Sequence, residues 1–253
     1  MSMLDDLFCE LPCGRHTNIK RLSTDREVHV WRRSLNCSST TADKMQELLV
    51  DDERQRAQRF RFARDRSQFI VRRAALRIIL SRYLGAGPAE IRFNNGWQGK
   101  PRLSGEFADS ELEFSITHSQ GMALIAVAAG QRIGVDLECV RPLSDLDGLL
   151  SQCLSPAELR SLSAEGLGDT LNGFYRYWTC KEAHLKALGI GLACRLDSVR
   201  ISFGSANGTG TAEICGDSID STRLFIWSFS PFSGYFAAAA FTHRDSRLRC
   251  FGF

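Results

Sequence analysis

The spacing of apolar residues first predicts helical structure between residues 43 and 84. Apolar side chains recur there near the 3.6-residue period, at Phe69, Ile70, Ala74, Leu76, Ile79, Leu80 and Tyr83. Gly85 then stands where a helix C-cap is expected. A short strand at 91–93 and a turn-rich stretch at 94–101 follow. The next apolar segment, 114–140, predicts a hairpin that turns around Ala129-Gly130-Gln131.

The same succession of elements returns in the second half of the chain. A helix is expected over 174–189, ending at Leu188-Gly189, and a strand over 199–203. An apolar strand pair over 225–241 turns near Gly234. This repetition predicts an α+β fold made of two similar lobes with a pseudo-twofold relation. We place the lobes at 1–140, with a variable segment at about 1–28, and at 141–253, joined by an outer stretch near 140–151. The cleft between such lobes is the expected ligand site.

Composition narrows the class of protein. The chain has 253 residues, of which 43% are apolar and 24% are charged, as in ordinary globular proteins and unlike disordered ones. No stretch reaches the roughly 18–20 apolar residues of a membrane helix, and the first residues lack a signal-peptide pattern. We therefore expect a cytoplasmic protein without a membrane partner. Nine cysteines without a CxxC pair argue against a zinc site or a disulfide framework.

Positive charge is concentrated in one part of the chain, although the net charge is only +3. Ten arginines lie between residues 54 and 82, with few acidic residues among them: Arg54, Arg56, Arg59, Arg61, Arg64, Arg66, Arg72, Arg73, Arg77 and Arg82. Such an excess attracts phosphates or an acidic protein surface. It is also compatible with a plain solvated helix face, so the cluster alone does not decide between them.

Two carboxylates stand near the end of an apolar strand, in the sequence Gly134-Val135-Asp136-Leu137-Glu138. Residues two apart on a strand share a face, so Asp136 and Glu138 project together while Val135 and Leu137 face the core. Adjacent carboxylates raise each other's pKa unless a cation lies between them, and Mg²⁺ is the natural partner for oxygen ligands and phosphates. An acidic strand end in solvent is the alternative.

The helix expected over 174–189 contains a second group of polar residues. Glu182 and Lys186 lie one turn apart on one side, either as part of a site or as a surface ion pair. Lys181 falls in the middle of the apolar arc. Breaks of this kind tend to mark functional sites, although a lysine can also extend its stem along apolar surface and expose its amine.

Taken together, these segments resemble the 4′-phosphopantetheinyl transferase superfamily, in its larger, two-lobed Sfp-type branch. Five motifs appear in the family's order across about residues 50–195: Arg59-Phe60-Arg61-Phe62-Ala63-Arg64-Asp65, Gly99-Lys100-Pro101, Phe114-Ser115-Ile116-Thr117-His118-Ser119, Gly134-Val135-Asp136-Leu137-Glu138 and Trp178-Thr179-Cys180-Lys181-Glu182-Ala183-His184-Leu185-Lys186. The first 40 residues and the tail after Thr242 match no motif of the family.

The resemblance implies an enzyme that uses Mg²⁺ to transfer the phosphopantetheine arm of coenzyme A to a serine of an apo carrier protein, releasing adenosine 3′,5′-bisphosphate. It implies metal ligands at Asp136, Glu138 and Glu182, with Glu138 at a position that varies in the family. It implies coenzyme contacts at Arg56, Lys100, Pro101, Ser115, Thr117, His118, Asp136, Glu182 and Lys186, with Arg56 facing the 3′-phosphate. Lys186 would assist catalysis, and the serine proton would be taken by Glu182, directly or through a metal-bound water, or by Glu158.

Partners and competing functions follow from the same motifs. Carrier proteins of this kind present acidic helices, which suit the arginine-rich face at 59–82, although the same arginines could instead frame the coenzyme. A chain with two lobes is expected to act as a monomer. A Mg²⁺-dependent hydrolase of a nucleotide pyrophosphate and an arginine-rich module for RNA or another polyanion are the competing functions. Neither explains five ordered motifs, and the RNA-binding motifs that the second requires are absent. A carrier-binding relative without activity is disfavoured by the intact acidic set. The sequence does not indicate which carrier is modified.

Overall fold

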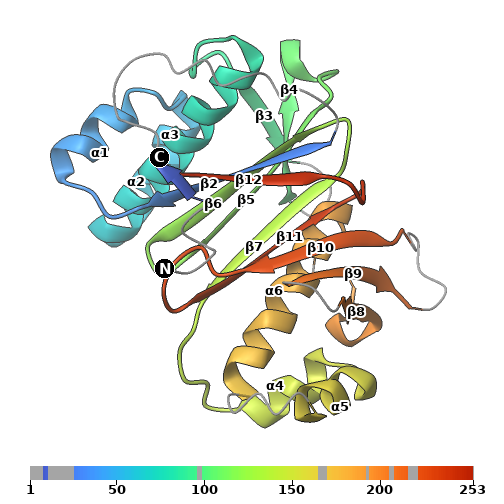
Figure 1. The fold of residues 1–253 in the computed structure, drawn as a ribbon. Coiled ribbons are helices and arrows are strands. Elements are labelled where there is room, and N and C mark those ends of the chain that lie inside the picture. Colours follow the sequence, from blue (N-terminus) through green and yellow to red (C-terminus); the bar gives the residue numbers. More distant parts are fainter. Residues whose placement is uncertain are drawn as a thin grey trace.

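The computed structural model describes residues 8–10, 26–95, 99–164, 170–191, 194–204, 208–215 and 222–252. Two five-stranded sheets pack against each other, and helices cover their outer faces (Figure 1). The first sheet has the order β1-β12-β2-β6-β5, and the second has the order β7-β11-β10-β9-β8. A separate pair, β3-β4, stands beside the first sheet.

The bounds of the elements are as follows. The first sheet contains β1 (Phe8–Glu10), β2 (Glu27–Ser34), β5 (Leu112–Ser119), β6 (Met122–Ala129) and β12 (Arg247–Gly252). The second contains β7 (Ile133–Cys139), β8 (Val199–Phe203), β9 (Thr209–Ile214), β10 (Leu224–Phe229) and β11 (Tyr235–Phe241). The helices are α1 (Ser39–Gln46), α2 (Asp51–Gln58), α3 (Ala63–Leu84), α4 (Leu146–Cys153), α5 (Pro156–Ala164) and α6 (Thr170–Leu188). The small pair is β3 (Arg92–Asn95) and β4 (Pro101–Ser104).

The two halves repeat one plan, which confirms the predicted α+β duplication. Each half runs through a strand, three helices and two further pairs of strands, and its first strand pairs antiparallel with its last: β2 with β6, and β7 with β11. The long helices α3 and α6 also end alike. Gly85 and Gly189 both adopt positive φ, 68° and 74°, and each donates its N–H to a carbonyl four residues earlier at 2.9 Å.

The predicted lobe boundary at residue 140 is wrong. Strand β7, over 133–139, belongs to the second sheet, where it pairs with β11. The tail after Thr242 returns to the first sheet, where β12 lies parallel to β2. The Phe251 ring stacks on Trp31 with centroids 4.6 Å apart, so this unmatched tail completes the core of the first lobe.

The predicted hairpin turn is also wrong. The chain reverses between β5 and β6 at Gln120 and Gly121, whose φ angles of 43° and 80° fit a primed turn between antiparallel strands. Residues 129–131 instead join the two sheets. The apolar run hid the break because β6 is buried on both faces, between α3 and the second sheet.

The single helical region predicted over 43–84 is divided into α1, α2 and α3. Buried Glu53 holds α2 against α3, since its carboxylate accepts hydrogen bonds from Arg73 and from Arg77 Nε. Arg77 also donates to the carbonyls of Pro88 and Ile91 at 2.7 and 2.8 Å. These two members of the arginine cluster therefore stabilise the fold from within and do not belong to a solvated face.

Helix α6 approaches the backbone of β7 unusually closely at Gly134. A Cβ built at Gly134 would lie 2.0 Å from the Ala183 carbonyl oxygen and 2.4 Å from the Ala187 nitrogen. Only glycine permits this approach, which brings the polar end of α6 beside the carboxylates of β7. Within the part of the chain that the structure describes, no helix is long and apolar enough to cross a membrane.

Candidate active site

Strands β5 and β7 and helix α6 meet at Asp136. The residue is 3% exposed, and its Oδ1 accepts hydrogen bonds from Lys186 Nζ at 2.5 Å and from Thr117 Oγ1 at 3.2 Å. The neighbouring Val135 and Leu137 point into the core between the sheets, as the strand alternation predicted. Side chains from three elements thus converge on one buried carboxylate.

Two further carboxylates, Glu138 and Glu182, lie close enough to Asp136 for their charges to interact. Burial and then the negative charge of Asp136 raise the pKa of each above its ordinary value. Ser119 Oγ donates to Glu138 Oε2 at 3.0 Å. Asp136 Oδ2 and Glu182 Oε1 are buried and lack a hydrogen-bond partner among the described residues. A buried carboxylate oxygen without a partner costs free energy, so a bound cation would stabilise this cluster.

The donor set fits a hard divalent cation that is shared with a substrate. Mg²⁺ binds through one or two protein carboxylates and completes its shell with phosphate oxygens and water. No three His, Cys, Asp or Glu side chains in the described ranges are arranged as a ready-made metal site. The unpaired oxygens of Asp136 and Glu182 are therefore suited to an ion that arrives with a phosphate ligand and are not suited to a closed protein cage.

A trough leads away from the carboxylates along the surface of the first lobe. A cavity of about 390 Å³ beside them is lined in part by Lys100, Ser115, Glu182 and Lys186. A second cavity, of about 310 Å³, is lined in part by Arg56, Phe69, Arg72 and Phe93. Gly99, Pro101 and Ile116 line both cavities. The two cavities are therefore neighbours that share a wall.

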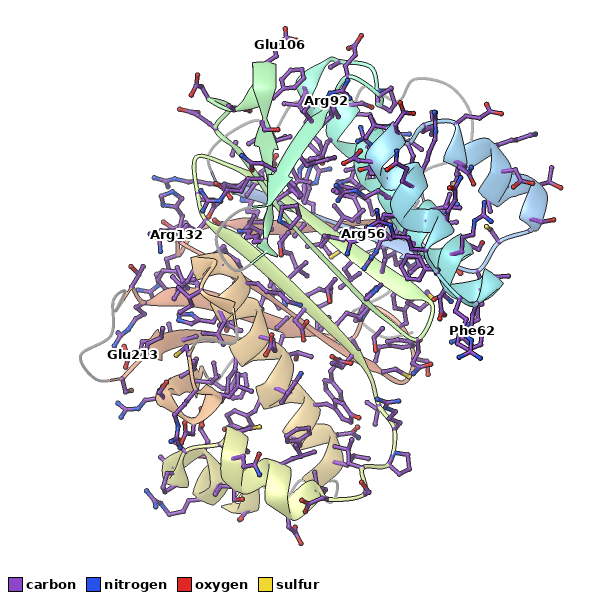
Figure 2. All side chains as sticks on the ribbon, turned by 180° about the vertical axis from the view of Figure 1, so that it is seen from behind. Arg56, Phe62, Arg92, Glu106, Arg132 and Glu213 are labelled. Carbon is purple, nitrogen blue, oxygen red and sulfur yellow. The ribbon has the colours of Figure 1, made fainter. Side chains whose placement is uncertain are left out.

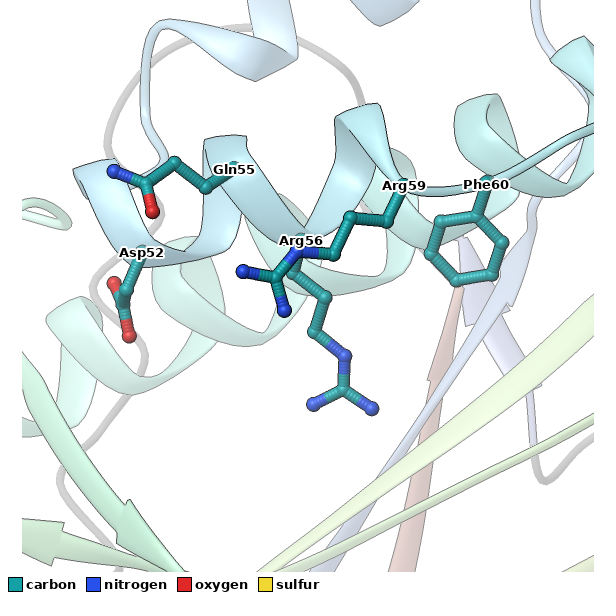
Figure 3. Close-up of a pocket in the computed structure, with 5 residues that line it drawn as sticks. All are labelled: Asp52, Gln55, Arg56, Arg59 and Phe60. Carbon is teal, nitrogen blue, oxygen red and sulfur yellow. The ribbon is translucent and has the colours of Figure 1, made fainter.

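A third cavity continues the trough over helix α2. It measures about 550 Å³ and shares Asp52 and Arg56 with the second cavity. Figure 3 shows the side chains of Arg56 and Arg59 extending from this helix, with the ring of Phe60 beside them. The trough thus has one end at Glu182 of α6, beside the carboxylates of β7, and an arginine-rich end at α2 and α3.

The basic end has more arginines than acids, since Asp52 and Glu53 also line it and Glu53 is bound by Arg73. The guanidinium groups of Arg56 and Arg72 lie 5.6 and 5.9 Å from the centroid of the Phe69 ring, and neither forms an ion pair with a described carboxylate. Burial, together with the charges of Arg73 and Arg56, lowers the pKa of Arg72 to about 10. Two guanidinium groups held close together in this way, neither of them in an ion pair, form a site for an anion.

His118, at the end of β5, interacts with charges from both ends of the trough. Its ring is exposed at the surface, yet desolvation by its surroundings lowers its pKa, and the positive charges of Arg72 and Lys186 act in the same direction. A lowered pKa favours the neutral ring, which donates one hydrogen bond from one nitrogen and accepts one at the other.

Glu158, the second candidate base, is engaged in a separate group of hydrogen bonds. The side chain is buried in the second lobe, where it accepts four hydrogen bonds of 2.7–2.9 Å from Lys181 Nζ, Ser155 N–H, Ser155 Oγ and Ile201 N–H. Lys181 is fully buried and also donates to the carbonyls of Leu196 and Val199. The pattern Ser155-Pro156-Ala157-Glu158 is a helix capping box, a sequence signal that favours the structural role.

Lys100 and Ser115 line the first cavity, but their polar atoms bind protein groups. Lys100 Nζ donates to the Ile133 carbonyl at 3.0 Å and lies 3.7 Å from Glu113 Oε2. Ser115 Oγ accepts the Val135 N–H at 3.1 Å. Both side chains thus fix β7 in place and support the wall of the cavity. Arg72 was counted in the arginine cluster but was not singled out from the sequence, since only the fold brings it to His118.

Comparison with known proteins gives two family matches that together span most of the chain. The model described as the 4′-phosphopantetheinyl transferase superfamily matches residues 132–240. The model described as 4′-phosphopantetheinyl transferase, N-terminal, matches residues 34–130. The matches meet where β6 passes into β7, which is the boundary that the sheet topology shows.

Individual relatives support the same family. The chain is 43% identical over 180 residues to the 4′-phosphopantetheinyl transferase HetI of Nostoc sp., a match that covers 70% of this chain and 74% of the relative. It is 28% identical over 159 residues to the transferase Sfp of Bacillus subtilis, covering 63% and 68%. A Thermotoga maritima holo-[acyl-carrier-protein] synthase overlaps 46% of this chain and 64% of its own, at 16% identity and a TM-score of 0.36. The two family matches and the HetI relative show that the chain belongs to the 4′-phosphopantetheinyl transferase superfamily, in its Sfp-type branch.

Proposed function

We propose that this transferase takes 4′-phosphopantetheine from coenzyme A, in the presence of Mg²⁺, and attaches it to a serine of an apo carrier protein. The observation that supports this most is the charge layout of the trough. Carboxylate oxygens without a described hydrogen-bond partner lie beside one end, and Arg56 and Arg72, which form no ion pair with a described carboxylate, line the other. A ligand with a pyrophosphate and a separate phosphate, as in coenzyme A, would match both ends at once.

The acidic end would bind the pyrophosphate. Asp136 and Glu182 would hold Mg²⁺ through their unpaired oxygens, with Glu138 as a further ligand. The bound ion would neutralise charge that develops on the phosphates during transfer. Lys186, which donates to Asp136, is 31% exposed at its side chain and can also reach a phosphate oxygen in the first cavity.

The basic end would bind the 3′-phosphate and orient the nucleoside. Arg56 and Arg72 offer guanidinium groups of the kind that bind phosphate, and His118 can add a hydrogen bond. Pro101 and Ile116, in the wall between the cavities, would face the nucleoside. Holding the ligand at both ends fixes the reacting phosphorus, and in phosphoryl-type transfer positioning is the larger part of catalysis.

Glu182 is the proposed acceptor of the serine proton, since Glu158 lies elsewhere. The serine oxygen would bond to the β-phosphorus as the bond from that phosphorus to the bridging oxygen breaks, and adenosine 3′,5′-bisphosphate leaves. The raised pKa of Glu182 suits a proton acceptor that works near neutral pH. We further propose that one chain suffices for the reaction, because both lobes and the trough belong to the same chain.

The test is mass spectrometry of intact carriers. The purified enzyme is incubated with coenzyme A, Mg²⁺ and a panel of apo carrier proteins, beside reactions with EDTA, with Glu182→Ala and with Glu106→Ala as an exposed control. One phosphopantetheine gained by a carrier, dependent on metal and on Glu182 but not on Glu106, would support the proposal. Coenzyme A consumed without any carrier would instead indicate a pyrophosphate hydrolase.

A further inference from the structure

Two large apolar side chains are exposed among the described residues, and they belong to the same loop. Phe60 is 38% exposed and Phe62 is 61% exposed, both in the connection between α2 and α3. Single exposed apolar residues are ordinary on protein surfaces, but a pair on one short loop is a candidate interaction site.

The fold explains one of the two rings. Phe60 lies 5.3 Å from the Phe69 ring, centroid to centroid, so part of its surface packs on α3. Phe62 occupies the N-cap position of α3 but makes no side-chain cap hydrogen bond, and the guanidinium of Arg61 lies 5.4 Å from its centroid. A serine, threonine or aspartate would cap this helix better. Neither capping nor core packing therefore accounts for Phe62.

Positive charge surrounds Phe62. Arg59 and Arg61 are exposed and form no ion pair within the described ranges, and Arg64 has only exposed Asp65 at 3.9 Å. An apolar anchor beside two unpaired guanidinium groups and a third that is weakly paired suits an acidic partner, because the arginines attract it from a distance and the ring packs once water has been excluded.

The patch lies beside the active-site trough. Arg64, Gln68 and Arg72 follow the i, i+4 spacing and so share one face of α3. At 1.5 Å of rise per residue, Arg64 and Arg72 are about 12 Å apart along the helix axis. Arg72 is also the residue whose charge lowers the pKa of His118. Figure 2 shows Phe62 at the tip of the helical layer, on the same side as Arg56.

We propose that Phe62, together with Arg59, Arg61 and Arg64, docks the acidic helix of the apo carrier protein that presents the reacting serine; this rests on the proposed function. A typical interface covers about 800 Å² per partner, and the patch adjoins the trough at Arg59, which lines the third cavity, so one interface can cover both. Phe62 is the anchor, and the three arginines orient the partner.

The experiment measures kcat/KM for the carrier and Kd for coenzyme A in Phe62→Ala, Phe62→Leu and Arg61→Glu. The exposed control is Arg92→Glu, because Figure 2 shows Arg92 at the far end of the first lobe. We expect Phe62→Ala to lower carrier kcat/KM about tenfold, as for an interface anchor, with coenzyme A binding unchanged and Phe62→Leu largely restored. Arg61→Glu lowers it too and flattens its salt dependence, whereas Arg92→Glu does neither.

Wild-type carrier kinetics in Phe62→Ala and Arg61→Glu, with unchanged melting temperatures, would overturn the docking proposal while leaving the function intact. An equal loss of coenzyme A affinity in the Phe62 variant would also overturn it, because the residue would then act on the coenzyme site. If the wild-type enzyme modifies no carrier at all, the proposed function fails first and the docking proposal falls with it.

Discussion

Replacing Gly134 by alanine tests whether the close contact between α6 and β7 assembles the active site. The added methyl would lie 2.0 Å from the Ala183 oxygen, whereas ordinary contact begins at 3.4 Å, so α6 must move by 1.4 Å (3.4 − 2.0). Both atoms nearest to the new methyl belong to the helix backbone, which cannot swing aside as a side chain can. Glu182 and Lys186 would move away from Asp136 with the helix.

The expected magnitudes follow from this displacement. Overpacking of a tight core costs about 1–3 kcal/mol, and we expect the upper end because backbone must move. For a chain of this length, that predicts a melting temperature lower by roughly 6–12 °C. A displacement of about 1 Å between catalytic groups can reduce the rate about 100-fold. Circular dichroism melting and kcat/KM for coenzyme A, measured well below the melting temperature, check the two effects separately.

Gly87→Ala is the matched control, since its new methyl would meet only the flexible carboxylate end of Glu90, at 3.3 Å. We expect it to leave both quantities near their wild-type values. A Gly134→Ala enzyme with an unchanged melting temperature and more than half of the wild-type kcat/KM would refute the reasoning that this contact positions the site.

Three further predictions concern the carboxylates. A carboxyl whose pKa is raised by folding binds its proton more tightly in the folded state, so the charged form of Glu182 destabilises the metal-free protein above that raised pKa. Glu182→Gln should therefore raise the melting temperature of the metal-free protein at pH 7.5. This rise in melting temperature should vanish as the pH falls through the raised pKa of Glu182. A rise that persists at low pH would contradict the charge of Glu182 as its cause. Mg²⁺ with coenzyme A should raise the melting temperature of the wild type but not of Glu182→Gln, as thermal shift measurements can show. Glu158→Ala should destabilise the fold by about 3–5 kcal/mol, because Lys181 stays buried without its carboxylate partner. The variant that remains folded at low temperature should keep most of its kcat. A stable but inactive variant would restore Glu158 as a candidate base.

Local periodicity was sufficient to orient the key acidic residue. The alternation along 133–139 placed Asp136 opposite Val135 and Leu137, and the structure agrees. The position of Lys181 in the apolar arc was also correct, but its meaning was not. Whether a buried lysine serves chemistry or packing depends on its partner, and Glu158, 23 residues earlier, is brought to it only by tertiary structure.

Pairing between distant strands was not predictable from the chain alone. Nothing in the residues of β12 indicates that Leu248 aligns with Val28, because a short apolar strand fits many edges equally well. The same uncertainty affected β7, whose apolar residues would suit either sheet. The adjoining cavities were beyond sequence reasoning for a related reason: Arg72, Pro101 and Lys186 come from three separate elements.

The position of β12 between β1 and β2 affects the order in which the protein can fold during synthesis. Domains usually fold from the N-terminus onward as they leave the ribosome. Here the first lobe cannot complete its sheet until the second lobe has been made, since β12 follows β11 in the chain. The second lobe, whose strands and helices lie between residues 133 and 241, is continuous and can fold first. The sheet of the first lobe is thus the last to be completed. Residues 26–131 expressed alone would leave β2 without the neighbouring strand that β12 provides.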